Sequence, residues 1–283
     1  MIDLSILIVH YNTPGLLRQT LKGLRQSAPQ LKYEIIVVDN NPQQPVAERL
    51  RLEFPEVKVI VNQQNVGFGR GMNQAMIQAE GRYSLIFNPD IALFAGTLEK
   101  LLAYMDEHPE IGMLGPQLNH PDGSLQYSCY RFMKPSTILY RRLPFMTLWP
   151  KAKKAVAEYL MEDWDHEQTR AVDYLLGAVM LVRREAIEQV GGFDPNYFVY
   201  FEDQDLCRRF WLAGWPVVYY PEAKVVHYHR RETAAGNFLS QLLNPLTRIQ
   251  MKSALYYYKK YQGQENPRLN YQQNFDYDRI SLS

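Results

Sequence analysis

Short apolar segments alternate with amphipathic segments through the first 110 residues, and this alternation constrains the fold more than any other feature of the sequence. Four of the apolar segments are predicted strands, over residues 4–9, 34–38, 57–61 and 83–87. Helix-like patterns separate them, and a further helix is predicted over residues 95–108. Strands that alternate with helices at this spacing predict βαβ units with right-handed crossovers around a parallel sheet.

The pattern becomes less regular after Gly115. Residues 117–170 contain several prolines and the basic run 151–154, which predicts irregular connections and short helices. The tail, from residue 233 to about residue 261, is a long amphipathic segment that Pro245 should break or kink. Elements predicted between these regions are a strand over residues 172–182, a helix over 184–190, and strands over 217–220 and 224–226.

The composition excludes several classes of protein. Hydrophobic residues make up 46% and charged residues 22%, and the net charge of +1 gives no electrostatic signature of nucleic-acid binding. The two cysteines, Cys129 and Cys207, form no C-x-x-C pair, which argues against a disulfide framework or a cysteine-based zinc site. The sequence shows neither a signal-peptide pattern nor a segment apolar enough to cross a bilayer, so we expect a cytoplasmic protein.

Polar residues follow each of the four predicted strands in the first half. They are Asn12, Asp39, Asn65 and Asp90. Because ligands of parallel sheets bind beyond the carboxyl ends of the strands, these side chains predict a nucleotide-like ligand across one edge of the sheet.

The segment Asn65-Val-Gly-Phe-Gly-Arg-Gly-Met-Asn73 is rich in glycine and follows the third predicted strand. Its spacing is G-x-G-x-G rather than G-x-G-x-x-G, which argues against a nicotinamide or flavin site. We expect glycines such as Gly67 to let the backbone approach a ligand closely, and Arg70 to reach a phosphate.

The segment Asn88-Pro89-Asp90 ends the fourth predicted strand and has two interpretations. It is a common turn sequence, which would explain it without any ligand. The functional interpretation is a cation site, because one or two carboxylates often hold Mg²⁺ or Mn²⁺ together with phosphate oxygens of a substrate. His227, with His229 close behind it, could add a nitrogen ligand and would favour Mn²⁺, although a lone histidine is more often structural.

Residues 198–209 combine aromatic side chains with three carboxylates, Glu202, Asp203 and Asp205. The apolar spacing that follows predicts a helix that begins at these acids and ends near Gly214. Acidic residues stabilise the first turn of a helix, so capping alone would explain them. A carboxylate in such a half-apolar setting is also a candidate general base.

These motifs together resemble those of the family 2 glycosyltransferases, in the subgroup that includes bacterial rhamnosyltransferases. The resemblance covers roughly residues 3–230, and the motifs occur in the order that the family has. The matching pieces are Ile8-Val9-His10-Tyr11-Asn12, Val37-Val38-Asp39-Asn40, residues 65–73, Phe87-Asn88-Pro89-Asp90, Gly177-Ala178, Gly191-Gly192-Phe193-Asp194, Glu202-Asp203-x-Asp205-Leu206 with Arg209, and Val226-His227.

The resemblance implies an α/β fold of the GT-A type, with a Rossmann-like, mixed and mainly parallel sheet flanked by helices. It implies one domain over residues 1–230, with a nucleotide-binding half (1–115) and an acceptor-binding half (116–230), followed by a C-terminal helical extension (231–283). The implied activity is an inverting transfer from a nucleoside-diphosphate sugar, with dTDP-rhamnose as the subgroup's suggestion, to a hydroxyl of a glycan or lipid-linked saccharide. The alternative is a catalytically inert nucleotide-sugar-binding protein on the same fold.

The resemblance also assigns roles to residues. Asp39 would face the nucleotide base in a pocket lined by Tyr11, Asn12 and Asn65. Asp90 would match the last carboxylate of the metal-binding D-x-D motif, and Asn88 stands where the first Asp often does. Asp203 would be the general base, His227 would contribute to the metal or diphosphate site, and Phe198, Tyr200 and Trp215 could form walls facing the sugars.

The tail has two interpretations. Its amphipathic helices could pack on the enzyme's own core or on the partner in a homodimer. Alternatively, Arg248, Lys252, Lys259 and Lys260, interleaved with apolar residues, could contact a membrane surface on the inner face of the cell membrane.

Overall fold

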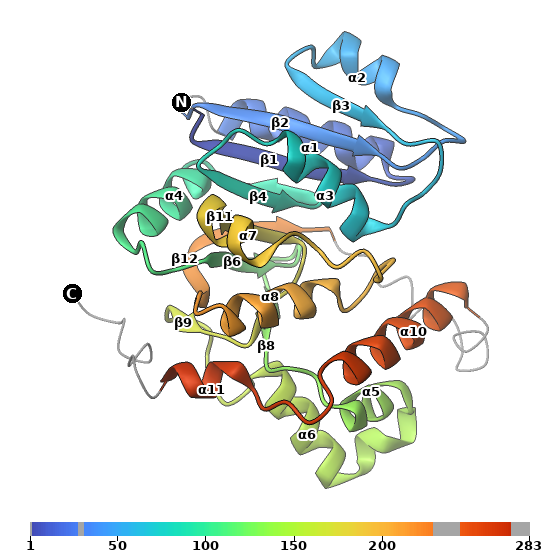
Figure 1. Ribbon diagram of the computed structural model, residues 1–283, viewed down its shortest axis with the longest axis vertical. Coiled ribbons are helices and arrows are strands. Elements are labelled where there is room, and N and C mark those ends of the chain that lie inside the picture. The colour runs from blue at the N-terminus through green and yellow to red at the C-terminus, as the bar shows by residue number, and fades with distance from the viewer. Residues whose placement is uncertain (1, 28–30, 229–243, 273–283) are drawn as a thin grey trace.

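The structure is a computed structural model that describes residues 2–27, 31–228 and 244–272 (Figure 1). The first part comprises β1 (Leu4–His10), α1 (Pro14–Ser27), β2 (Tyr33–Asp39), α2 (Ala47–Glu53), β3 (Val57–Val61), α3 (Phe68–Gln78), β4 (Tyr83–Phe87), β5 (Ile91–Leu93) and α4 (Thr97–Glu107). The middle comprises β6 (Met113–Asn119), β7 (Leu125–Gln126), β8 (Cys129–Tyr130), α5 (Pro135–Arg142), the 3₁₀ helix η1 (Pro144–Leu148) and α6 (Pro150–Leu160). The last part comprises β9 (Arg170–Ala171), β10 (Tyr174–Leu175), β11 (Val179–Arg183), α7 (Arg184–Val190), α8 (Glu202–Leu212), β12 (Val217–His227), α10 (Pro245–Lys260) and α11 (Pro267–Gln272).

One mixed sheet runs through the centre, with the strand order β3-β2-β1-β4-β11-β6-β12-β5. Strands β3, β2, β1 and β4 are parallel, and β12 is parallel to β6. Strand β11 is antiparallel to both of its neighbours, and β5 is antiparallel to β12. The predicted α/β fold with a mainly parallel sheet is therefore confirmed. Because β11 lies between β4 and β6, and residue 115 lies within β6, the two predicted halves share this sheet.

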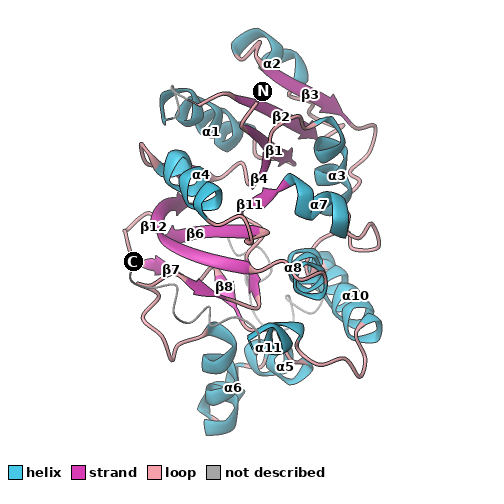
Figure 2. Ribbon diagram, turned by 60° about the vertical axis from the view of Figure 1, so that its left-hand side comes forward, coloured by secondary structure: helices cyan, strands magenta, loops and turns pink. Residues whose placement is uncertain are grey.

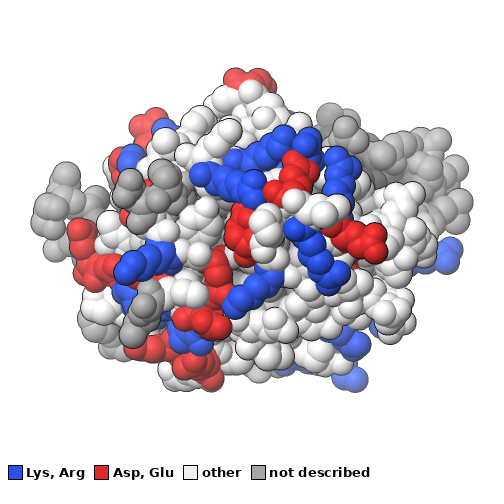
Figure 3. All heavy atoms as spheres, turned by 90° about the horizontal axis from the view of Figure 1, so that it is seen from above, with Lys and Arg blue, Asp and Glu red and all other residues white. Residues whose placement is uncertain are grey.

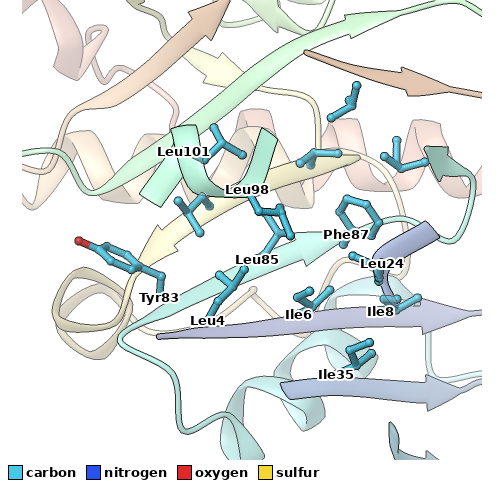
Figure 4. Close-up of a cluster of buried hydrophobic side chains, with 14 of the residues drawn as sticks. Leu4, Ile6, Ile8, Leu24, Ile35, Tyr83, Leu85, Phe87, Leu98 and Leu101 are labelled. Carbon is cyan, nitrogen blue, oxygen red and sulfur yellow. The ribbon is translucent and has the colours of Figure 1, made fainter. Parts of the chain in front are cut away.

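Both faces of the sheet are covered, as the apolar character of β1 predicts. All seven residues of β1 are buried. Leu4, Ile6 and Ile8 pack with the apolar sides of α1 and α4 on one face (Figure 4). Leu7 and Val9 belong to the cluster on the other face, which includes residues of α3 and α8. Alternate residues of a strand point to opposite faces, so a strand covered on both sides is apolar throughout.

The second half differs from its prediction in how the strands are divided. The predicted strand over residues 172–182 is two strands, of which β10 pairs with β8 in a small separate sheet. The two strands predicted over residues 217–226 are one, β12, with a register irregularity between Tyr220 and Lys224 (Figure 2). Trp215 precedes β12 whereas His227 ends it, and the indole N–H of Trp215 donates to Gln189 Oε1 at 2.8 Å. Its role as a wall facing the sugars stays a prediction.

The C-terminal helix α10 begins at Pro245, with the side chain of Asn244 accepting a hydrogen bond from Leu246 N at 2.9 Å. Pro245 therefore starts a helix rather than kinking one, since its missing N–H costs nothing in the first turn. The predicted tail before it, residues 233–243, lies outside the described residues, as does His229. None of the described helices combines the length and the apolar character needed to span a membrane.

Candidate active site

Asp203 lies in the first turn of α8, at the edge of the sheet where β4 ends and β11 begins. Its Oδ1 accepts a hydrogen bond from Gln204 N at 2.8 Å, and its Oδ2 accepts one from Gly177 N at 3.2 Å. Two backbone N–H groups thus hold the half-buried carboxylate, and such bonds favour its ionised form. A Cβ on Gly177 would lie 3.3 Å from Cβ of Asp203, so the glycine allows this close approach.

Glu202 precedes Asp203 and has a different environment. Its side chain is buried, and Oε2 has no hydrogen-bond partner among the described residues. Burial, and then the negative charge of Asp203, raise the pKa of Glu202 to about 8. Burial also raises the pKa of Asp203, although its two backbone donors oppose this. Two adjacent carboxylates do not both ionise readily. The two backbone N–H donors favour the charge on Asp203, whereas burial without a hydrogen-bond partner for Oε2 favours the protonated form of Glu202.

The segment that leads into α8 has an unusual backbone. Tyr200 and Phe201 have φ angles of 71° and 69°, a conformation that bulky residues rarely adopt. Such strain persists only where surrounding contacts impose it, and it clusters at functional sites. The strained pair here fixes the direction in which α8 presents Asp203.

Helix α3 supplies the contacts that hold this segment. Gly67 precedes the helix with φ 87°, and a Cβ on it would lie 2.3 Å from the carbonyl oxygen of Phe198. The same oxygen accepts a hydrogen bond from Phe68 N at 2.9 Å. Asn73 exchanges two hydrogen bonds of 2.7 Å with the backbone of Phe193. The glycine-rich segment therefore docks the chain that leads to Asp203.

These contacts give Gly67 and Arg70 a structural role, and their approach to a ligand phosphate stays a prediction. Helix α3 begins at Phe68, six residues before the predicted helical residues that start at Gln74, so Arg70 lies within it. Arg70 Nε donates to the carbonyl oxygen of Pro195 at 2.8 Å, which again ties α3 to the segment before α8.

Asp39 ends β2 and is 1% exposed. Its Oδ2 accepts a hydrogen bond from Val46 N at 2.7 Å, and its Oδ1 accepts one from Asn41 N at 3.2 Å. Both oxygens hold the loop that follows β2, and the contact of Asp39 with the nucleotide base stays a prediction. Oδ1 also lies 3.2 Å from Nδ1 of the buried His10.

His10 connects that buried carboxylate to the exposed turn after β1. Thr13 N donates to His10 Nε2 at 3.1 Å, so Nδ1 must carry the proton and donate to Asp39. Burial lowers the pKa of His10, which keeps the ring neutral in this arrangement. The turn that it supports presents Tyr11, 50% exposed, and the exposed Asn12, whose φ of 60° an asparagine tolerates. His10 therefore positions this turn. It lies in the motif Ile8-Val9-His10-Tyr11-Asn12, but the sequence alone predicted no role for it.

Asn65 lies beyond β3 and is half-buried. Its Oδ1 accepts a hydrogen bond from Gly67 N at 2.9 Å, so it stabilises the turn before α3. Asn40, the first residue after β2, donates from Nδ2 to the carbonyl oxygen of Gly67 at 3.0 Å. These contacts bring the ends of β2 and β3 together. The sequence predicted this, because the carboxyl ends of parallel strands lie at one edge of the sheet.

Asp90 and His227 come together although 137 positions separate them in the sequence. Strand β5 pairs with β12 so that Ile91 lies opposite His227, and His227 Nε2 is 3.4 Å from Asp90 Oδ1. Asp90 Oδ1 is buried and accepts no hydrogen bond from the described residues, which fits an oxygen that serves as a cation ligand. No group of three or more His, Cys, Asp or Glu side chains suited to a metal occurs in the described part of the chain. Any cation there would need further ligands from its substrate.

Asn88 links this pair to Asp203. Its backbone N–H donates to the carbonyl oxygen of Ala178 at 2.9 Å, and the preceding residue, Gly177, donates to Asp203. Strands β4 and β11 therefore hold the segment 88–90 beside the segment that supports Asp203. The residues brought to this edge are Asn88, Asp90, Gly177, Asp203 and His227.

Sequence comparisons identify the family. The family model described as "Glycosyl transferase family 2" matches residues 5–191, and that described as "Glycosyl transferase family group 2" matches residues 135–248. The chain is 32% identical over 245 residues to N-acetylglucosaminyl-diphospho-decaprenol L-rhamnosyltransferase of Mycobacterium tuberculosis, covering 81% of this chain and 77% of that protein. It is 28% identical over 235 residues to rhamnosyltransferase WbbL of Escherichia coli (strain K12), covering 79% of this chain and 82% of that protein.

Solved structures show the same fold. The structure of GalNAc-T7 with UDP, GalNAc and Mn²⁺ has a TM-score of 0.61 at 16% identity. The match covers 98% of this chain and 55% of the GalNAc-T7 chain. Mannosyltransferase PcManGT from Pyrobaculum calidifontis, in complex with GDP-Man and Mn²⁺, has a TM-score of 0.56 at 15% identity. The match covers 95% of this chain and 78% of that chain. The fold and the edge that carries these polar residues define a glycosyltransferase of the GT-A type. The chain belongs to glycosyl transferase family 2 and is rhamnosyltransferase-like.

Proposed function

We propose that this protein transfers a sugar, with inversion at the anomeric carbon, from a nucleoside-diphosphate sugar to a hydroxyl of a lipid-linked saccharide. The relatives that are rhamnosyltransferases favour dTDP-rhamnose as the donor. The name of the mycobacterial relative describes an acceptor on a diphospho-decaprenol carrier, which favours an acceptor of that chemical class. We assign donor binding to residues 1–115, acceptor binding to residues 116–230, and support of the catalytic helix to the extension, 231–283.

The environment of Asp203 carries the proposal. A sugar hydroxyl is a weak nucleophile at neutral pH, so a positioned base that takes its proton accelerates the attack. Asp203 receives two backbone N–H bonds that favour its charged form and stands at the start of a helix, whereas burial favours the protonated form of its neighbour Glu202. The proton of the acceptor hydroxyl passes to Asp203 while the new bond to the anomeric carbon forms and the bond to the diphosphate breaks.

Asp90 and His227 are the residues that would hold a divalent cation, Mg²⁺ or Mn²⁺. The carboxylate oxygen of Asp90 and the ring of His227 form a mixed oxygen and nitrogen pair, and donor phosphates would complete the coordination. A bound cation would neutralise charge on the departing diphosphate. The Mn²⁺ ions in the two structural neighbours support this assignment.

A lipid-linked acceptor would place the enzyme at the inner face of the cell membrane, where it meets nucleotide sugars from the cytoplasm. Because no described helix could span the bilayer, we propose peripheral association.

The test is a panel of nucleotide sugars that includes dTDP-rhamnose, assayed for thermal stabilisation of the protein and for transfer to a polyprenyl-diphosphate saccharide. We expect one nucleotide to stabilise the protein and the product to have the inverted configuration. Donor binding without transfer or hydrolysis, across all acceptors tried, would instead favour the inert nucleotide-sugar-binding protein.

A further inference from the structure

A strongly basic segment stands out in a chain whose net charge is only +1. Residues 134–157 contain no aspartate and no glutamate, and they include α5, η1 and most of α6. We call α5, η1 and α6 together the helical hairpin. Helices α5 and α6 lie at the end of the molecule opposite β3 and α2 (Figure 1). The basic residues of the segment are Lys134, Arg141, Arg142, Lys151, Lys153 and Lys154.

Large apolar side chains are exposed on α5 and along its connection to α6. The exposed fractions are 51% for Leu139, 63% for Phe145, 81% for Leu148 and 47% for Trp149. We call these four residues the apolar tip. Tyr140 packs edge-on against Trp149 with ring centroids 6.0 Å apart, which gives the tip an aromatic base. Exposed apolar residues are ordinary when scattered, whereas these four lie within eleven positions of the chain.

The lysines that adjoin the tip have no acidic partner among the described residues. Lys151, Lys153 and Lys154 are exposed, and they form no ion pair within the described residues. The opposite end of the molecule shows basic and acidic side chains interspersed (Figure 3). There, Arg18 pairs with Glu53 at 2.6 Å and Arg25 with Glu56 at 2.6 Å. The charge of these three lysines is therefore available to an external anionic partner, whereas Lys134 pairs with Glu158.

The base of the hairpin reaches the surroundings of Asp203. Tyr159 of α6 lies with its hydroxyl 2.6 Å from that of Tyr174 on β10, and Arg141 of α5 stacks over the Tyr159 ring. Tyr174 is only three residues before Gly177, which donates to Asp203. One element thus connects an exposed apolar tip with the surroundings of the proposed base.

We infer that the helical hairpin docks this protein on an anionic lipid bilayer, with the apolar tip in the interface and the lysines against lipid headgroups. Lysine next to Trp, Phe and Leu is the composition of interfacial membrane segments, and Trp prefers the boundary between hydrocarbon and headgroups. The inference deepens the proposed function, because a lipid-linked acceptor would then approach Asp203 from the side that faces the membrane. We propose the hairpin in place of α10, whose Lys260 points inward to Asp205 but whose Lys252 is exposed, and the α10 variant below distinguishes the two elements.

The test is sedimentation of the full chain with vesicles of phosphatidylcholine, with and without phosphatidylglycerol. We expect binding only to the anionic vesicles. Replacing Lys151, Lys153 and Lys154 by Gln should weaken it about fivefold for each lysine. The pair Phe145→Ser and Leu148→Ser should weaken it at least tenfold.

Two controls make the result specific to the hairpin. Leu52→Ser on α2 removes a leucine that is 87% exposed, similar to Leu148, and should bind vesicles like the unmodified protein. The pair Lys252→Gln and Leu255→Ser removes exposed residues of α10 and should also leave binding unchanged. Unchanged binding of the hairpin variants, or loss of binding in the α10 variant, would overturn the inference.

Transfer assays separate this inference from the proposed function. We expect the hairpin variants to retain transfer to a short-chain, water-soluble acceptor and to lose it toward an acceptor embedded in vesicles. Vesicle binding that depends on the hairpin, in a protein without any transfer activity, would overturn the proposed function and support the docking surface.

Discussion

Lys260 on α10 places its Nζ atom 2.6 Å from Oδ1 of Asp205, two residues after Asp203 on α8. Asp205 is completely buried, and the hydroxyls of Tyr197 and Tyr261 also donate to its Oδ1. Lys260 Nζ lies equally close to Asp194, at 2.6 Å. Helix α10 is therefore bonded to the helix that carries the proposed base.

Lys260→Met should destabilise the protein by about 3 kcal/mol, because it leaves the buried Asp205 without one of its two cationic partners. The remaining partner is Arg209, whose Nε lies 2.8 Å from Asp205 Oδ2. Urea unfolding of the variant measures the loss. Lys259→Met, at the exposed neighbouring position, serves as control and should change stability by less than about 0.5 kcal/mol. Equal stabilities of the two variants would contradict the structural role of Lys260.

Asp203→Asn should reduce transfer about 10³-fold, since an amide cannot accept the proton of the acceptor hydroxyl. Donor affinity should stay nearly unchanged, because the site proposed for the diphosphate is at Asp90 and His227. Initial rates and a donor titration measure both quantities. Asp163→Asn, on a side chain that is 57% exposed, is the matched control and should retain activity. Full activity of Asp203→Asn would exclude this residue as the base.

Glu202→Gln should change how stability depends on pH. Glu202 has a pKa of about 8 in the folded protein and 4.5 as a free side chain, so the folded state holds an extra proton between these values. Stability of the unmodified protein should therefore fall as the pH rises from about 4.5 through 8. The variant lacks this titration and should be the more stable protein at pH 8, with little difference at pH 4. Thermal unfolding at several pH values tests this, and parallel curves would refute the buried, protonated state of Glu202.

Asp90→Ala should remove the part of donor binding that depends on Mg²⁺ or Mn²⁺. The reason is that the substitution removes the only carboxylate assigned to the cation among the described residues. Donor titrations by calorimetry, with the divalent ion and with a chelator, give the comparison. A variant whose donor affinity still rises on addition of the ion would show that the cation binds elsewhere.

Gly67→Ala should destabilise the protein and impair catalysis together. A Cβ at this position meets the carbonyl oxygen of Phe198 at 2.3 Å, and φ is 87°, so the cost should be about 2 kcal/mol or more. Gly23→Ala is the matched control, because nothing lies within 4 Å of its Cβ, and it should stabilise helix α1 slightly. Unfolding midpoints and transfer rates of both variants test whether α3 positions the segment before α8.

Local patterns in the sequence were sufficient for much of the fold. The predicted bounds of β3, β4 and α7 match the structure, because each depends on hydrophobic periodicity and on stop signals such as Gly191. The start of α3 was missed, since Gly69 and Gly71 are poor helix formers in isolation. Phe193 and Val9 pack closely against the positions of these glycines, and both come from other parts of the chain.

The sequence by itself determined the family, the sheet whose strand ends carry Asn12, Asp39 and Asp90, and the helix that begins at the acids. It could not determine which acid is charged, because that depends on burial and on the N–H of Gly177, a residue 26 positions away. Nor could it show that Asp39 supports its own loop or that the glycine-rich segment holds residues 193–198. Only the tertiary structure decided these points, since hydrogen bonds and desolvation depend on neighbours that the folded chain brings together.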